Sequence, residues 1–290
     1  FFYKERAKYR ILIVWMAKET MKARSLSAVR NLLLQRISKN RLLLLPLSLL
    51  VFLLLWQILV LALKLPSFIL PSPAEVGKKF LDVLASGMLW RHFSATLKEI
   101  LLGLIFGVSA AALLGYGLSK SPIAERMLSP FLVGSQSIPM AAVAPLLVIW
   151  FGPGLLSKVL ICSLTVFFPV LVNTLVGLRD VPQDLREVMR SLRSSPAQTL
   201  RYLEIPAALP VFLGGLRVGA SLSVIGAIVG ELVASDQGLG FLINVGRGQY
   251  DTALVFVAVI CLVVLAASLY GFVLLLEKKL LSWQTWRKEN

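Results

Sequence analysis

The residues best suited to do chemistry lie in a charged segment of about thirty residues, 179–209. Pro182 can begin a short helix there, because a proline at the first helical position lacks only an N–H that the helix leaves unpaired anyway. Ser195 is typical of an N-cap for a second short helix beginning at Pro196. Four apolar side chains recur at helical spacing on one face of the first helix: Leu185, Val188, Met189 and Leu192. Such an amphipathic helix either docks on a partner or is a solvated linker.

A second group of candidates consists of uncharged polar side chains inside otherwise apolar runs. Ser135, Gln136 and Ser137 come directly before Ile138 and Pro139, and Asn173 and Thr174 lie in a later run. Hydroxyl and amide groups donate and accept hydrogen bonds without carrying charge. Two interpretations stay open: these groups line a polar path through a membrane, or they form interhelical hydrogen bonds worth about 0.6 kcal/mol each.

Ionisable side chains within apolar runs are typical of ion pathways in secondary transporters. Arg217 and Glu231 are the main candidates, and both lie in the fifth run. We expect Arg217 to extend its guanidinium to the nearer interface. Glu231 is close to the outer end and is expected to face water, and His92 is expected outside the membrane. These positions do not predict a proton relay.

Several kinds of site are missing from the sequence. No Gly-x4-Gly-Lys-Ser/Thr motif occurs, and Gly77-Lys78-Lys79 matches only its central dipeptide, so we expect no ATP site on this chain. Cys162 and Cys261 lie far apart in apolar runs and are interpreted as packing residues. We therefore predict no catalytic residue, no metal site and no cofactor, and a protein that is not itself an enzyme.

The elements that must position these residues are long apolar runs, and 57% of the chain is hydrophobic. A helix rises about 1.5 Å per residue, so about twenty apolar residues cross a hydrocarbon core roughly 30 Å thick. The chain is therefore predicted to be an all-α membrane protein with six transmembrane helices. The six runs are 42–63, 100–118, 128–150, 155–178, 209–234 and 252–276.

Glycine and proline positions predict how these helices pack. Glycines one helical turn apart let helix backbones approach closely in lipid. Three such pairs occur: Gly103 and Gly107, Gly215 and Gly219, and Gly226 and Gly230. Pro139 and Pro145 interrupt the third run, which is either kinked or broken where it lines a cavity. Pro206 and Pro210 are expected to end the charged segment before the fifth run.

The distribution of positive charge predicts the orientation. With the N-terminus inside, 22 Lys and Arg lie in cytoplasmic segments and seven lie outside, and cytoplasmic loops carry the excess in membrane proteins. The formal charge of +15 is thus attributed to the cytoplasmic face and to anionic lipid, not to nucleic acid. We predict a basic cytoplasmic N-terminal arm at 1–41, a six-span domain at 42–276 that includes the loop 179–209, and a cytoplasmic C-terminal tail at 277–290.

The charged loop resembles the cytoplasmic signature of ABC importer permeases, which reads Glu-Ala-Ala, three residues, Gly, nine residues, then Ile-x-Leu-Pro. Here Glu187-Val188-Met189 begins the match, Arg193 stands at the glycine, and Leu203-Glu204-Ile205-Pro206 ends it. Glycine permits a positive φ that arginine adopts only at a cost, so the turn geometry stays open. The resemblance implies that the loop couples the membrane domain to an ATPase subunit. The implied coupling residues are Leu185, Glu187, Val188, Met189, Leu192, Arg193 and Pro206.

A second resemblance covers nearly all of the chain after residue 65. It is similar to the nitrate, sulfonate and taurine permease family, which includes permeases for riboflavin and thiamine pyrimidine precursors. The matching segments are Leu70-Pro71-Ser72-Pro73, Ile138-Pro139, Ala144-Pro145-Leu146, Trp150-Phe151-Gly152 and Gly238-Leu239-Gly240-Phe241-Leu242-Ile243.

This resemblance implies a type I ABC importer permease fold in the inner membrane, with coupling helices between spans four and five. It implies a second copy of the chain, two ATPase subunits and an extracytoplasmic solute-binding protein as partners. In the oxyanion branch an arginine is expected shortly before the proline of span three, whereas Gln136-Ser137-Ile138 stands here. The expected solute is a vitamin-like heterocycle, with a small oxyanion as the alternative and an ATP-independent secondary transporter as the rival class.

The first fifteen residues, Phe1 to Trp15, precede Met16. Two interpretations stay open for them. Met16 is the natural start of the protein, or the segment is a basic amphipathic arm on the membrane surface.

Overall fold

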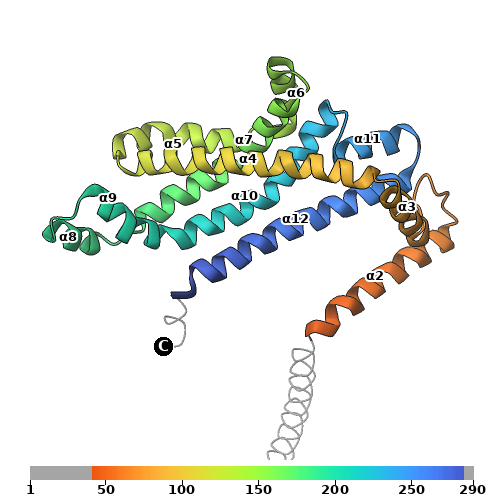
Figure 1. Cartoon of the computed structure of the whole chain (residues 1–290), viewed down its shortest axis with the longest axis horizontal. Helices are drawn as coiled ribbons and strands as arrows, with labels where there is room; N and C mark the ends of the chain where they lie inside the picture. The colour runs from red at the N-terminus through yellow and green to blue at the C-terminus, as the bar shows by residue number, and fades with distance from the viewer. Residues whose placement is uncertain (1–40, 284–290) are drawn as a thin grey trace, which may run out of the picture. The chain divides into compact units, whose positions relative to one another are not determined.

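The computed structural model describes residues 41–283, and all regular secondary structure in that range is helical (Figure 1). The prediction of an all-α protein is therefore confirmed. The predictions for Phe1–Trp15 and for most of the N-terminal arm and C-terminal tail lie outside the described residues. The chain divides into two units at Leu65 and Pro66. Helix α2 (Arg41–Leu63) belongs to the first unit and contains an apolar stretch of 18 residues, Pro46–Leu63, that is long enough to cross a membrane.

The second unit contains the other spans. Its α-helices are α3 (Pro73–Ala85), α4 (Met88–Ser119), α5 (Pro122–Gln136), α6 (Met140–Phe151), α7 (Leu155–Arg179), α8 (Gln183–Ser191), α9 (Pro196–Thr199), α10 (Ile205–Val233), α11 (Leu239–Gly248) and α12 (Thr252–Leu280). A π-helix, η1 (Leu200–Glu204), joins α9 to α10. With α2, the described residues hold five helices able to cross a membrane, or six if α5 and α6 form one broken span.

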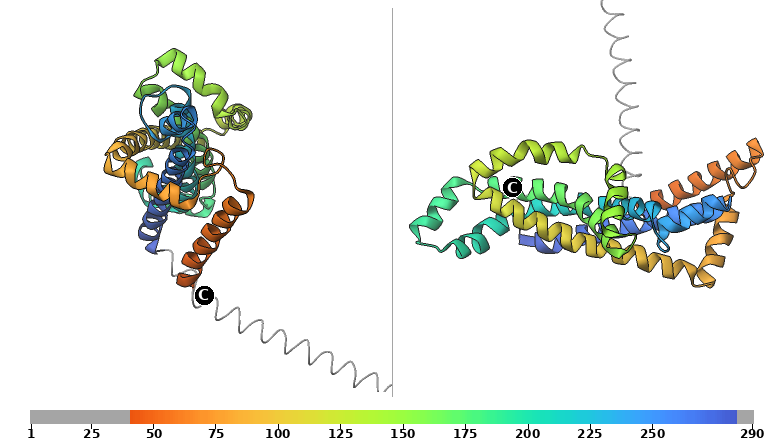
Figure 2. Two further views of the ribbon diagram at one scale, coloured as in Figure 1. Left: turned by 90° about the vertical axis from the view of Figure 1, so that its right-hand side faces the viewer. Right: turned by 90° about the horizontal axis from the view of Figure 1, so that it is seen from above.

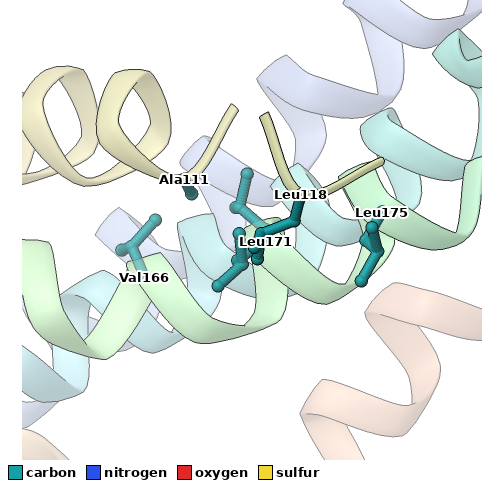
Figure 3. Packing of buried hydrophobic residues seen from close by; sticks show 6 residues of the cluster. Ala111, Leu118, Val166, Leu171 and Leu175 are labelled. Atoms are coloured by element: carbon teal, nitrogen blue, oxygen red, sulfur yellow. The ribbon is translucent and has the colours of Figure 1, made fainter. Parts of the chain in front are cut away.

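The core forms where α4 and α10 pack along α7, with α12 beside α10 (Figures 1 and 2). Figure 3 shows the apolar contact between α4 and α7. The predicted glycine pairs lie at these contacts. A Cβ on Gly103 would lie 2.3 Å from the Cβ of Cys162, and one on Gly226 would lie 2.9 Å from Oγ1 of Thr165. The prediction that these glycines allow close helix packing is confirmed.

The third span is broken. Helices α5 and α6 meet at 97°, with Ser137 ending α5 and Pro139 in the N-cap position of α6. Pro145 lies within α6 and does not end it. Of the two predicted alternatives, the structure has the break rather than the kink, and it lies at the first proline.

Several predicted boundaries are wrong, among them the start of α5, which lies at Pro122 rather than near residue 128. Helix α4 begins at Met88 rather than near residue 100, so part of the polar stretch before the second run is helical. Helix α10 begins at Ile205, so Pro206 and Pro210 lie inside it rather than in the loop. Pro206 lies just after the π-helical turn η1 (Leu200–Glu204), where the regular i→i−4 hydrogen-bond pattern of an α-helix is already interrupted.

The two ends of the bundle carry different short elements. Helices α8 and α9 lie at one end, and α3 and α11 lie at the other (Figures 1 and 2). Ser72 and Glu75 form a capping box at the start of α3. Helix α11 was not expected from the sequence. The charged loop with α8 and α9 therefore lies at the opposite end of the bundle from α3 and α11.

Candidate functional site

Helix α8 presents an apolar face to its surroundings. It begins at Gln183 with Pro182 in the N-cap position, one residue from the expected start. Leu185, Val188 and Leu192 are 46%, 53% and 71% exposed, whereas Met189 is half-buried. A nine-residue helix is too short to be stable alone. An apolar face this exposed on a short helix is typical of a protein-docking surface.

Glu187 lies on a different side of α8. Two residues along an α-helix correspond to a rotation of about 200°, which turns Glu187 away from Leu185. Its side chain is exposed, and so is that of Arg190. Docking through the apolar face therefore leaves Glu187 at the rim of the contact or facing a second wall of a groove.

The turn after α8 has a defined geometry that the sequence left open. Arg193 has a φ of +54°. Its N–H donates to the carbonyl of Arg190 at 2.9 Å, and the N–H of Ser194 donates to the carbonyl of Met189 at 3.0 Å. These two bonds form a Schellman motif, in which glycine usually occupies the left-handed position. Arg193 thus occupies the family's glycine position and adopts the conformation that glycine favours.

Replacing Arg193 with glycine should stabilise this helix end. A left-handed conformation costs a non-glycine residue about 1 kcal/mol, which corresponds to roughly a fivefold change in a local opening equilibrium. The amides of α8 in Arg193→Gly should therefore exchange with solvent about fivefold more slowly, as measured by hydrogen–deuterium exchange. Arg193→Ala is the control, since alanine keeps the strain. Equal exchange in the glycine and alanine variants would show that Arg193 is not strained.

The second short helix follows the prediction. The Ser195 hydroxyl accepts from the N–H of Gln198 at 3.3 Å, and the Gln198 side chain accepts from the N–H of Ser195 at 2.7 Å. This capping box confirms Ser195 as the N-cap, with Pro196 first in the helix. The helix continues through η1 into α10, so the loop is joined to a span without an intervening coil.

The charged loop contains a buried carboxylate that sequence reasoning missed. Glu204, in η1, is 2% exposed. The ammonium of Lys120, at the end of α4, donates to both carboxylate oxygens at 2.6 and 2.7 Å. The sequence signal for Glu204 is its position in the segment Leu203-Glu204-Ile205-Pro206, where an acidic residue comes directly before a membrane span.

The predicted path residues separate into two groups. Ser135 and Gln136 line a cavity of about 420 Å³ beside the break between α5 and α6. Thr165, Phe168 and Met140 also line it, and its lining contains no charged residue. Ser137 is exposed at the end of α5. The hydroxyl of Ser135 donates to the carbonyl of Phe131 in its own helix at 2.8 Å.

Asn173 and Thr174 lie elsewhere, at contacts between helices. The amide of Asn173 donates to the carbonyl of Pro169 at 2.8 Å, and a Cβ on Gly215 would lie 2.5 Å from its Cβ. The hydroxyl of Thr174 donates to the carbonyl of Val170 at 2.7 Å, and its methyl group packs close to Gly115. The structure does not bring these two residues to the cavity lined by Ser135 and Gln136.

A buried polar cluster joins α4, α10 and the start of α11, and it corrects the expectation for Glu231. Glu231 is fully buried rather than facing water. It accepts from the hydroxyl of Thr96 at 2.6 Å and from the N–H of Gly240 at 2.5 Å. His92 is also buried, and its Nδ1 accepts from the N–H of Gly238 at 3.0 Å. Single-sequence reasoning missed these roles because each residue lies near a span end, where water contact is the usual outcome.

Next to this cluster lies a buried ion pair. The ammonium of Lys158, at the start of α7, is 3.2 Å from Glu99 in α4 and donates to the hydroxyl of Ser235 at 2.6 Å. Lys158 and Glu99 lie at the edge of a polar cavity of about 1020 Å³, which is also lined by Arg91, Lys98 and Gln237. Lys158 is one of the seven Lys and Arg that the charge distribution assigned to the outside.

Arg217 pairs with Glu277 of α12, and its guanidinium also lies over the ring of Tyr270, 5.7 Å from the ring centroid. The pair joins α10 to the last turns of α12. Both candidate intramembrane ionisable residues, Arg217 and Glu231, are therefore bonded to side chains or backbone of other helices.

The sequence model of a family described as "binding-protein-dependent transport system inner membrane component" matches residues 103–282. The riboflavin transport system permease protein of Chloroflexus aurantiacus is 46% identical over 83% of this chain and 90% of that protein. The formylaminopyrimidine transport permease protein of Halalkalibacterium halodurans is 35% identical over 75% of this chain and 86% of that protein. The taurine transport system permease protein of Escherichia coli is 32% identical over 79% of this chain and 84% of that protein.

Solved structures show a similar fold. A chain of the MetNI methionine ABC transporter in an inward-facing conformation is 20% identical, with a TM-score of 0.54 over 69% of this chain and 97% of that chain. A chain of an amino acid ABC transporter, crystallised with histidines, is 21% identical, with a TM-score of 0.53 over 69% of this chain and 98% of that chain.

Proposed function

Since this chain belongs to the family of binding-protein-dependent transport system inner membrane components and is a permease subunit of the ABC importer type, we propose that α8 is the helix through which a separate ATPase drives transport. The observation that carries the proposal is the exposed apolar face of α8, formed by Leu185, Val188 and Leu192. The short helix projects this face away from the spans, where a partner can bury it. Buried apolar side chains contribute about 1.5–3 kcal/mol each, enough for docking.

The proposed assembly contains two copies of this chain, two ATPase subunits and an extracytoplasmic solute-binding protein. The cavity beside the α5–α6 break is open in the single chain, and the second copy would supply its other wall. Hydrolysis of ATP takes place in the partner, because this chain lacks the Gly-x4-Gly-Lys-Ser/Thr motif. Membrane lipid surrounds the outer faces of the spans.

The proposed orientation places both termini and α8 in the cytoplasm of a multi-pass inner-membrane protein. The excess of Lys and Arg in the corresponding segments supports it. A reporter enzyme that is active only in the cytoplasm should then be active when it is fused after Asn290. A reporter inserted at Gln237, in the turn between α10 and α11, should be active only outside. Activity on the opposite side at either position would contradict the orientation.

The proposed solute is a neutral vitamin-like heterocycle, such as riboflavin or a pyrimidine precursor. The uncharged lining of the 420 Å³ cavity, with Gln136 and Thr165 as hydrogen-bonding groups, supports a neutral solute. The higher identity to the riboflavin permease than to the taurine permease points the same way. A small oxyanion is the second candidate, and it would benefit from a cation that this cavity lacks. Uptake of taurine but not of riboflavin by the assembled importer would reverse this assignment.

A proton-coupled or ion-coupled transporter is the rival class. Such a protein needs an ionisable side chain that is reached from both sides of the membrane in turn. Arg217 pairs with Glu277, and Glu231 is fixed by Thr96 and Gly240. These contacts support structural roles for both residues and leave the energy source to the ATPase.

A further inference from the structure

A buried carboxylate lies at the root of the loop that carries α8. Both oxygens of Glu204 accept hydrogen bonds from Lys120, at 2.6 and 2.7 Å. The Nη1 of Arg186, from α8 itself, lies 3.7 Å from Oε1 of the same carboxylate. Glu204 therefore faces one cation from the end of α4 and one from α8, while its own backbone continues directly into α10.

Arg186 makes a second contact that extends this connection. Its Nη2 donates to the carbonyl of Leu178, near the C-terminal end of α7, at 2.6 Å. Carbonyls at the end of a helix have no intrahelical donors and attract cations. One guanidinium thus links α8 to α7 and, through Glu204, to α4 and α10.

Little else can hold α8 in a fixed direction. The helix has nine residues, and none of its side chains is fully buried. Of its apolar face, Leu185, Val188 and Leu192 point outward, and Met189 is half-buried. Only the carboxylate of Glu204 is buried, whereas Lys120 and Arg186 are partly exposed. Moving either cation away leaves a buried negative charge with less compensation, so Glu204 resists a displacement of Arg186 relative to the spans.

We infer that Glu204 is a positioning residue that makes α8 move together with α4, α7 and α10, so that a displacement of α8 reaches the spans. The inference rests on the proposed function, because it takes α8 as the helix displaced by the ATPase. If Glu204 has this role, the ratio of solute uptake to ATP hydrolysis depends on Glu204. This residue does not contribute to the exposed apolar face of α8.

The test uses the assembled importer with Glu204→Gln, which keeps the shape of the side chain and removes its charge. ATPase binding should persist, because Leu185, Val188 and Leu192 are unchanged. Uptake per ATP hydrolysed should fall roughly tenfold, the size of a typical coupling between sites. Glu125→Gln is the matched control. Glu125 is also buried and pairs with Arg179 at the same end of the bundle, but this ion pair joins α5 to α7 and involves no residue of α8.

A merely structural role predicts a different pattern. In that case Glu204→Gln would lower the amount of folded protein, as Glu125→Gln would, and the protein that remained would keep the wild-type ratio. An unchanged ratio in Glu204→Gln would therefore overturn the inference. Arg186→Gln, at a partly exposed side chain, provides the same test if Glu204→Gln does not accumulate.

A second measurement separates this inference from the proposed function. In the permease without its ATPase, Glu204→Gln should speed amide exchange across α8 and leave exchange in α12 unchanged. Unaltered exchange in α8 would contradict the proposed role of Glu204 in positioning α8, whatever partner α8 binds. A wild-type importer that moves solute without an ATPase would contradict the proposed function, while the exchange result would still decide the role of Glu204.

Discussion

Aspartate at both Leu185 and Val188 should abolish ATP-dependent uptake. The two side chains form the exposed apolar face of α8, and each contributes about 1.5–3 kcal/mol when buried against a partner. Aspartate removes that contribution and adds the cost of burying a charge. The double variant should bind the ATPase at least about a hundredfold more weakly. Co-purification with the ATPase and uptake into proteoliposomes measure the two effects.

The control for this variant lies on the same helix. Gln183 is exposed and lies two residues before Leu185, a rotation of about 200° that places it away from the apolar face, so Gln183→Ala should leave ATPase binding unchanged. Glu187→Lys should weaken binding less than the double variant, because Glu187 is rotated away from Leu185. Wild-type ATPase binding by the double variant would show that α8 is only a solvated linker.

Alanine at Gly238 should disrupt the opposite end of the molecule. Gly238 has a φ of +113°, and a Cβ there would lie 2.2 Å from the carboxyl carbon of Glu231. Glu231 cannot move aside, because Thr96 and Gly240 both bond to it. Backbone strain and overpacking together should lower the stability by on the order of 3 kcal/mol. The thermal unfolding midpoint should fall by several degrees, with a matching loss of uptake.

Gly248→Ala is the matched control for Gly238→Ala. Gly248 lies at the end of α11, and a Cβ there would have no neighbour within 4 Å. This variant should unfold at the wild-type temperature. If Gly238→Ala were equally stable, the contact between Glu231 and the Gly238-Leu239-Gly240 turn would not hold α11 in place.

The spans could be predicted from the sequence because lipid requires every backbone polar group to bond within its own helix. Apolar length alone therefore located α2, α7 and α12 to within a few residues. The start of α4 was not predictable in this way. Its first three turns mix apolar with polar and charged side chains, and His92, Thr96 and Glu99 within them bond to residues of other segments.

The charged loop was partly predictable because caps and turns are local. Ser195 and Pro196 specify the start of α9 through bonds within four residues. Arg193 was recognised as a departure from glycine, but its positive φ became clear only with the hydrogen bonds to Arg190 and Met189. The contact of Glu204 with Lys120 joins residues 84 positions apart, and no local pattern indicates it.

The buried polar cluster of Glu231 and His92, with Lys158 beside it, shows why single residues near span ends are difficult to interpret. Glu231 was expected to face water, His92 was expected outside the membrane, and Lys158 was counted among the seven outside charges. Their partners come from three other segments, so the burial of each depends on tertiary packing alone. The same packing explains why glycine occupies positions 238 and 240. The side chain of Glu231 fills the space that a side chain at either position would need.

Uptake by the reconstituted importer tests the central claim most directly. Proteoliposomes containing this chain would be prepared with its ATPase, with an ATPase variant that binds but does not hydrolyse ATP, and with no ATPase, each with the solute-binding protein and riboflavin outside. We expect accumulation only with the active ATPase and ATP. Accumulation at the same rate without any ATPase would contradict the account, because the chain would then transport solute by itself.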